Sequence, residues 1–157
     1  KNDPRRSQAS RLSAVAALAW LREAGYPEKF HTEIGHAIEA HSFSAAIEPK
    51  SIEAKIVQDA DRLDGLGAIG VARVFAVSGL LRRQLYDLED PFAAGGRRVD
   101  ALRFTIDHFY AKLFLTARTL RTAAGRQEGE RRVAFMRSFL KELGHEIGVP
   151  EDRIRLD

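Results

Sequence analysis

The segment "EAKIVQDADRLDGLGAIGVARVF", residues 53–75, has the apolar spacing of a helix and carries Asp59, Asp61 and Asp64 within six positions. Apolar side chains recur in it at steps of three and four residues, so we predict one long helix from about Ser51 to Val77. Its glycines lower the helix propensity, which indicates tight packing or a local irregularity. The expected core-facing stripe comprises Ile56, Ala60, Leu63, Gly67 and Val74.

Helical periodicity extends over most of the chain, and no strand-like alternation of useful length occurs, so the predicted fold class is all-α. Proline and clustered serines predict a loop over 41–51, and "DLEDPFAAGGRR" predicts another over 87–98. The other expected helices run from about Ser7 or Ser10 to Gly25, from Pro27 or Glu28 to His41, from Val99 to Leu120 and from Glu128 to Ile147.

Composition limits the class of protein. The 157 residues, 45% of them hydrophobic, fit one globular domain over 1–157. The 25 basic and 22 acidic residues make the chain mixed in charge rather than polycationic. The net charge of +3 favours an anionic ligand such as a phosphate ester. Because cysteine is absent, a metal would need His, Asp, Glu or carbonyl ligands, and we expect a cytoplasmic protein. No apolar run approaches the roughly 20 residues of a membrane span, so no membrane partner is expected.

The three aspartates cannot all have the same role. At 100° per residue, Asp61 and Asp64 share one face of the helix, whereas Asp59 points elsewhere. Asp61 adjoins the predicted core stripe and therefore needs a positive partner at the edge of the interior. A salt bridge to Arg62 or Arg73 is one possible partner, and a divalent metal is the other.

Two histidines precede this helix. His36 and His41 are five residues apart, a spacing that places them about 140° apart on a regular helix. Both can face one ligand only if the helix ends near His41, and the serines that follow favour such an ending. For each histidine alone, a packed or surface imidazole is the alternative interpretation.

"HAIEAHSFS" at 36–44, together with residues 53–75, resembles the HD-domain metal-dependent phosphohydrolases, in particular a bacterial subgroup of small stand-alone members. "YDLEDPF" at 86–92, "TIDHFYAKL" at 105–113 and "TAAGR" at 122–126 are also similar to that subgroup. The resemblance implies an HD-like helical bundle in which a His, an adjacent His-Asp pair and a later Asp hold a divalent metal, with manganese, magnesium, iron, cobalt or nickel as the candidates. It implies attack of water on a phosphate ester or anhydride, with nucleotides as the expected substrates.

The resemblance also suggests roles for individual residues. Asp61 matches the later metal-binding Asp, while Asp59 and Asp64 would be supporting or structural. His36 and His41 resemble the additional histidines with which some members hold a second metal and others bind phosphate, and we expect them to be catalytic. The expected substrate contacts are Lys1, Lys112 and Arg126.

The sequence departs from the family pattern because it contains no adjacent His-Asp pair. In the family that pair lies shortly before a stretch like residues 1–10, so we expect this chain to lack roughly the first two helices. We therefore expect the parent protein to be an enzyme and this chain alone to be inactive, and we expect a homo-oligomer.

Two other functions are compatible with the sequence. A catalytically degenerate HD-like module that binds nucleotides or regulates would also fit the missing pair. A helical nucleic-acid-binding domain ranks third, because the arginines of "LLRRQL" and "GRRVDALR" are interspersed with other residues and lack an aromatic stacking pattern.

Overall fold

The computed structural model describes residues 8–157, and Lys1 lies outside them. The chain divides into two compact units. The N-terminal unit is Lys1–Asp61 with Arg121–Gly125, and the C-terminal unit is Arg62–Leu120 with Arg126–Asp157. The expectation of one domain over 1–157 stays a prediction.

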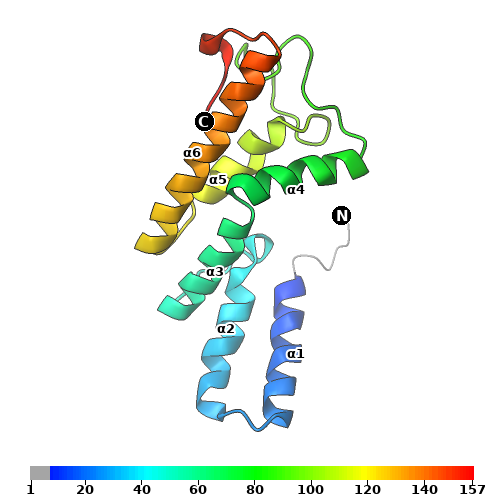
Figure 1. The fold of residues 1–157 in the computed structure, drawn as a ribbon. Helices are drawn as coiled ribbons and strands as arrows, with labels where there is room; N and C mark the ends of the chain where they lie inside the picture. The colour runs from blue at the N-terminus through cyan, green and yellow to red at the C-terminus, as the bar shows by residue number, and fades with distance from the viewer. Residues whose placement is uncertain (1–7) are drawn as a thin grey trace. The chain divides into compact units, whose positions relative to one another are not determined.

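The architecture is all-α, which confirms the predicted class (Figure 1). The α-helices are α1 (Ala9–Glu23), α2 (His31–His41), α3 (Ile52–Asp64), α4 (Gly67–Leu80), α5 (Phe114–Ala117) and α6 (Ala123–Glu146). Short helical turns are η2 (Glu28–Phe30), η3 (Phe43–Ala45), the π-helical η4 (Phe109–Leu113) and η5 (Glu151–Arg153). Over residues 8–157 no single helix is long and apolar enough to cross a membrane, although α3 and α4 taken as a bent pair meet that length and composition criterion.

In the N-terminal unit, α1 and α2 form a helical hairpin (Figure 1). Gly25 ends the first helix with a φ of +68°, as predicted for a helix stop. A Cβ at Gly35 would lie 3.0 Å from the Leu18 side chain, so the missing side chain allows close packing of the two helices. The second helix ends at His41, also as predicted, because Ser42 has extended backbone.

The predicted helix over 51–77 is interrupted, and the expectation of one continuous helix is wrong. The chain turns at Gly65 and Leu66 between α3 and α4. Gly67 has a φ of +71°, which side-chain-bearing residues rarely adopt. A Cβ at Gly70 would lie 2.2 Å from the Gly65 carbonyl oxygen, so this turn packs directly against α4. The glycines therefore mark both the irregularity and the close packing.

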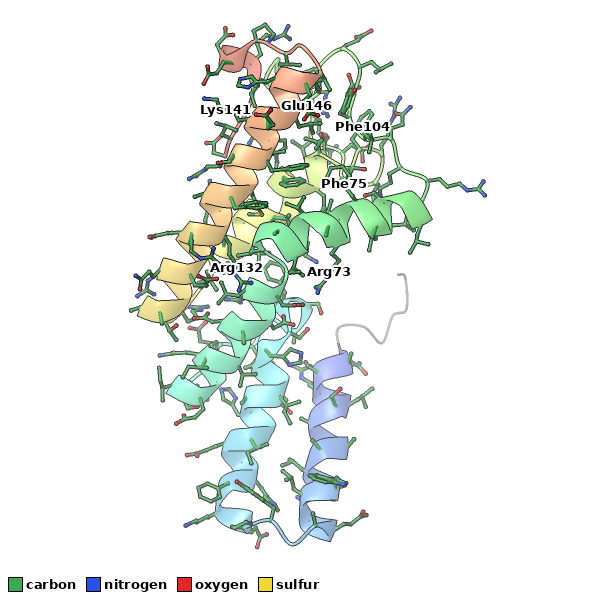
Figure 2. The ribbon with its side chains drawn as sticks, viewed as in Figure 1. Arg73, Phe75, Phe104, Arg132, Lys141 and Glu146 are labelled. Carbon is green, nitrogen blue, oxygen red and sulfur yellow. The ribbon has the colours of Figure 1, made fainter. Side chains whose placement is uncertain are left out.

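The C-terminal unit has an aromatic core. Phe109 stacks on Phe139 with ring centroids 6.1 Å apart. Phe75 of α4, labelled in Figure 2, meets Phe139 edge-on at 5.6 Å. Phe109 is fully buried, and the other two rings are partly buried against the core, so all three contribute to the hydrophobic stabilisation of the unit. The fully buried side chains around them include Leu66, Phe92, Ile106, Met136 and Leu140.

The predicted helix over 99–120 is wrong in its first part. On a helix over these residues Leu102 would share one face with Ile106, Phe109 and Leu113, but Leu102 is 82% exposed while the other three are buried. Residues near 104 instead pair with the segment after α4, because the Gln84 carbonyl accepts the backbone N–H of Thr105. This non-local pairing overrides the helical spacing.

The stripe predicted for residues 56–74 is also partly wrong. Ile56 is 54% exposed and Ala60 is exposed, although Gly67 and Val74 are buried as predicted. The buried face of α3 instead carries the polar Gln58 and Asp59. Hydrogen bonds from Arg121 and Thr122 compensate the burial of Asp59. Gln58 donates from Nε2 to the Ala40 carbonyl, while its buried Oε1 has no hydrogen-bond partner among residues 8–157.

Candidate functional site

Asp59 is a buried structural anchor of the N-terminal unit. Its side chain is only 3% exposed. One carboxylate oxygen accepts the backbone N–H of Arg121, and the other accepts the backbone N–H and the hydroxyl of Thr122, each at 2.8 Å. Three donors thus compensate the buried negative charge of Asp59. The start of α6 also favours a negative charge, because the backbone N–H groups there point toward it.

The same contacts explain "TAAGR". Thr122 precedes α6, and its hydroxyl oxygen also accepts the backbone N–H of Gly125 at 2.9 Å, as an N-cap residue does. A Cβ at Gly125 would lie 2.3 Å from the nearer Asp59 oxygen, so only glycine permits this approach. The cap also explains why α6 begins at Ala123, before the predicted start at Glu128.

The other two aspartates are exposed. Asp64 pairs with Arg73 at 2.6 Å, and both side chains are more than half exposed, so this pair adds little stability. Asp61 has no hydrogen bond or ion pair with any described residue of 8–157. The proposed salt bridge from Arg73 therefore goes to Asp64, and Arg62 is buried and donates to the Thr119 carbonyl.

The histidines at 36 and 41 differ in their available nitrogen atoms. His36 accepts the backbone N–H of Lys50 through Nε2 at 3.0 Å, so that lone pair is used. His41 places Nδ1 2.6 Å from the Ile38 carbonyl. Because a carbonyl only accepts, Nδ1 of His41 donates and Nε2 keeps a lone pair for a ligand. A third histidine, His31, donates from Nε2 to the Tyr26 carbonyl at 3.0 Å and is structural.

Metal coordination requires several such groups to converge. Within the part of the chain that the structure describes, no group of three or more His, Asp or Glu side chains is arranged to hold a metal ion. The predicted trio of His36, His41 and Asp61 therefore does not form a metal site by itself.

The structure describes two of the three predicted substrate contacts. Lys1 lies outside the described residues. Lys112 is exposed on the π-helical turn. Arg126 lies on α6, where it lines a pocket of about 300 Å³ within the C-terminal unit.

We call this the Arg118 pocket, after the arginine that follows α5. Its lining comprises Phe114, Ala117, Arg118, Arg126, Gly129, Glu130, Val133, Arg137 and Asp157.

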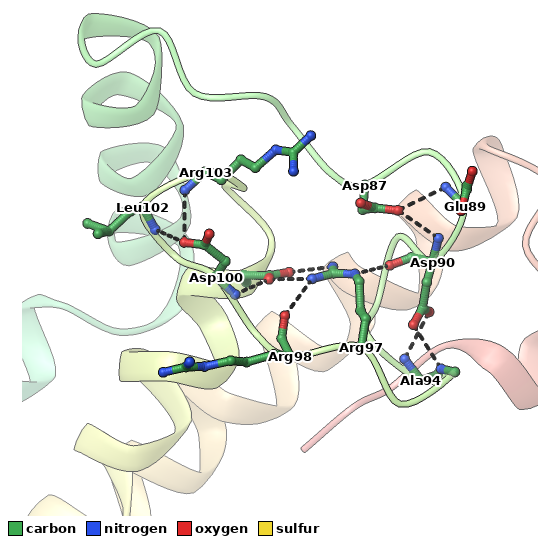
Figure 3. Close-up of polar contacts among 11 residues, drawn as sticks. Asp87, Glu89, Asp90, Ala94, Arg97, Arg98, Asp100, Leu102 and Arg103 are labelled. Carbon is green, nitrogen blue, oxygen red and sulfur yellow. Dashed lines mark hydrogen bonds and ion pairs between the residues drawn. The ribbon is translucent and has the colours of Figure 1, made fainter.

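A buried ion pair, not anticipated from the sequence, organises the loop after α4 (Figure 3). Asp107 is fully buried and binds Arg97 through two hydrogen bonds of 2.6 and 2.7 Å. Its carboxylate also accepts the backbone N–H of Asp100, and the Arg97 Nε donates to the Asp90 carbonyl. The hydrogen bond to Asp107 raises the pKa of Arg97 above its usual value. These contacts hold the loop in place, so the role of the ion pair is structural.

The family of the chain follows from comparison with known proteins. Residues 4–66 match the family model described as HD domain. The fold is similar to the crystal structure of an HD-superfamily hydrolase from Bacillus thuringiensis, with a TM-score of 0.69 and 34% identity over 87% of this chain and 63% of that one. The chain belongs to the HD-domain family. This confirms the resemblance read from "HAIEAHSFS" and the aspartate segment.

Other relatives of this HD-domain chain come from Bacillus subtilis and Listeria innocua. The uncharacterized protein YpgQ of Bacillus subtilis is 37% identical over 141 residues, which cover 87% of this chain and 62% of YpgQ. A crystal structure of YpgQ in complex with ADP has a TM-score of 0.65 and 28% identity, over 85% of this chain and 61% of that one. The Lin1889 protein of Listeria innocua is 30% identical with a TM-score of 0.68, over 90% and 69%. The chain thus spans less than two thirds of the length of YpgQ.

Proposed function

We propose that this chain is part of a metal-dependent phosphohydrolase that acts on phosphate esters or anhydrides. Nucleotides are the proposed substrates, and Asp61 is the proposed metal ligand. Membership of the HD-domain family and similarity to an HD-superfamily hydrolase support the reaction class. The bound ADP in a YpgQ structure supports the choice of nucleotides.

The observation that carries the proposal is the division of roles among the three aspartates. Both carboxylate oxygens of Asp59 accept hydrogen bonds at the start of α6, and Asp64 pairs with Arg73. Asp61 alone of the three has no internal partner among residues 8–157, and its side chain is exposed. The helix α3 is thus anchored through Asp59 and exposes the carboxylate of Asp61. A carboxylate is the kind of ligand that hard divalent cations prefer.

The residues present do not complete a metal site. Asp61 and the Nε2 atom of His41 are available as ligands, whereas Nε2 of His36 is already used, and no convergent trio occurs in the described residues. These residues alone therefore support no catalytic step through a metal. We propose that Asp61 joins further ligands of the full-length protein that lie outside residues 8–157.

The decisive experiment compares Asp61→Asn with Asp64→Asn in the full-length protein. Both variants neutralise an exposed carboxylate of α3 and change the net charge equally. Asp64→Asn also loses the exposed pair with Arg73, which adds little stability. Hydrolysis of a nucleotide panel is measured with each candidate divalent metal, beside circular dichroism spectra.

We expect Asp61→Asn to abolish hydrolysis and Asp64→Asn to retain it, with both proteins fully helical. Turnover by Asp61→Asn at the level of the unmodified protein would remove Asp61 from the site. Nucleotide binding by the unmodified full-length protein without hydrolysis under any metal would instead favour the regulatory module.

A further inference from the structure

The Arg118 pocket combines an apolar floor with a basic rim. It lies between α5 and α6 and belongs entirely to the C-terminal unit. Phe114 and Ala117 line it from α5, and Val133 lines it from α6. Its volume of about 300 Å³ is at the lower end of the range of small-molecule sites, which typically pair an apolar lining with a few polar groups.

The rim carries three guanidinium groups against two carboxylates. Arg118, Arg126 and Arg137 line the pocket together with Glu130 and Asp157. The Asp157 carboxylate lies 3.7 Å from Arg155, which is not among the lining residues, and both side chains are more than a third exposed, so this pair is weak. By side-chain charge the lining has one more guanidinium group than carboxylates, which favours an anion.

The arginines differ in how they are held. Arg137 is fixed by a hydrogen bond from its Nε to the Leu156 carbonyl at 2.9 Å, which leaves its terminal nitrogen atoms available. Arg118 has no ion pair with any described residue of 8–157. A guanidinium without a carboxylate partner can bind a phosphate through two parallel hydrogen bonds.

We propose that the Arg118 pocket binds an organic phosphate without a metal: Arg118 and Arg137 bind the phosphate, and the organic group rests on Phe114 and Val133. The requirement for an organic group follows from the floor, since burial of an apolar ring there adds to the charge interaction. Asp61 is not among the residues that line this pocket, and the proposal does not rest on the proposed hydrolase activity.

Phenyl phosphate is a suitable probe, because it joins one aromatic ring to one phosphate dianion. We would titrate the full-length protein with it in the presence of EDTA and follow backbone amide resonances by NMR. Inorganic phosphate and phenol, titrated separately, report the contributions of charge and ring. Saturable shifts are expected at Gly129 and Val133, with binding about tenfold tighter than that of inorganic phosphate and no saturation by phenol.

The matched variants are Arg118→Gln and Arg131→Gln. Arg131 is also an exposed arginine, but it pairs with Glu128 on α6 and does not line the pocket. We expect Arg118→Gln to weaken phenyl phosphate about tenfold, Arg118→Lys to recover part of the loss, and Arg131→Gln to stay within about twofold. Unchanged affinity in Arg118→Gln, equal affinity for inorganic phosphate, or no saturable shift of the pocket amides would each overturn the proposal.

Discussion

Gly125→Ala tests the anchoring role assigned to Asp59. In an ordinary helix this change stabilises the protein, because alanine loses less backbone entropy than glycine on folding. Here the added Cβ would lie 2.3 Å from an Asp59 carboxylate oxygen and 2.9 Å from the Thr122 hydroxyl oxygen. Both contacts are far shorter than van der Waals separation, so Asp59 has to move away from the start of α6.

The magnitude follows from the contacts that such a movement breaks. Asp59 accepts three hydrogen bonds, from the Arg121 amide and from the amide and hydroxyl of Thr122. At about 1 kcal/mol each, allowing for access of water to the exposed Arg121, their loss costs about 3 kcal/mol. The alanine substitution returns about 1 kcal/mol through helix propensity. The expected net loss is therefore about 2 kcal/mol of unfolding free energy.

Urea denaturation followed by circular dichroism measures this difference through the transition midpoint at constant slope. Gly79→Ala is the matched control, because Gly79 also lies in a helix and a Cβ there would meet nothing within 4 Å. It should stabilise the protein by about 0.5–1 kcal/mol. If Gly125→Ala were as stable as Gly79→Ala, the argument that glycine is required beside Asp59 would be refuted.

Two further predictions concern ion pairs. Arg97→Gln should destabilise the protein by about 3–5 kcal/mol in the same assay, because it leaves the fully buried Asp107 without its partner, and the exposed neighbouring Arg98→Gln should change stability by less than about 0.5 kcal/mol. Glu128 should titrate near pH 2 by NMR, since hydrogen bonds led by that from Arg131 lower its pKa from 4.5 to about 2. Its contribution to stability is then complete above about pH 4.5 and is lost as the pH falls through 2, and a midpoint that Arg131→Gln leaves unchanged would contradict this cause.

The helix faces show where sequence spacing misleads. The predicted apolar stripe placed Ile56 and Ala60 in the core, but the buried face of α3 carries Gln58 and Asp59. Gln58 donates to the Ala40 carbonyl at 2.6 Å, and the partners of Asp59 lie more than 60 residues later in the chain. Hydrophobic periodicity assumes that polar groups prefer water, and it fails where distant backbone groups supply their hydrogen bonds.

The sequence predicted the relative directions of the aspartates but not which of them is buried. The spacing of Asp59 and Asp61 correctly placed them on different faces of the helix, because that depends only on helical geometry. The expectation that Asp61 lies at the edge of the interior is wrong, because Asp59 is the buried carboxylate and Asp61 is exposed. The available nitrogen of His41 was likewise beyond the sequence, since it depends on which ring atom meets the Ile38 carbonyl.

By itself, the sequence determined the all-α class, the end of a helix at His41 and the aspartate segment that marks the HD-domain family. The helical class and the helix end depend on local backbone preference and side-chain periodicity, which neighbouring residues specify, whereas the family follows from the resemblance of the segment itself. Only the tertiary structure decided that Asp59 is held by Thr122, that Asp107 is buried against Arg97 and that Arg118 lines a pocket. Each of these depends on a partner that folding brings close from elsewhere in the chain, and a buried charge is stable only where such a partner arrives.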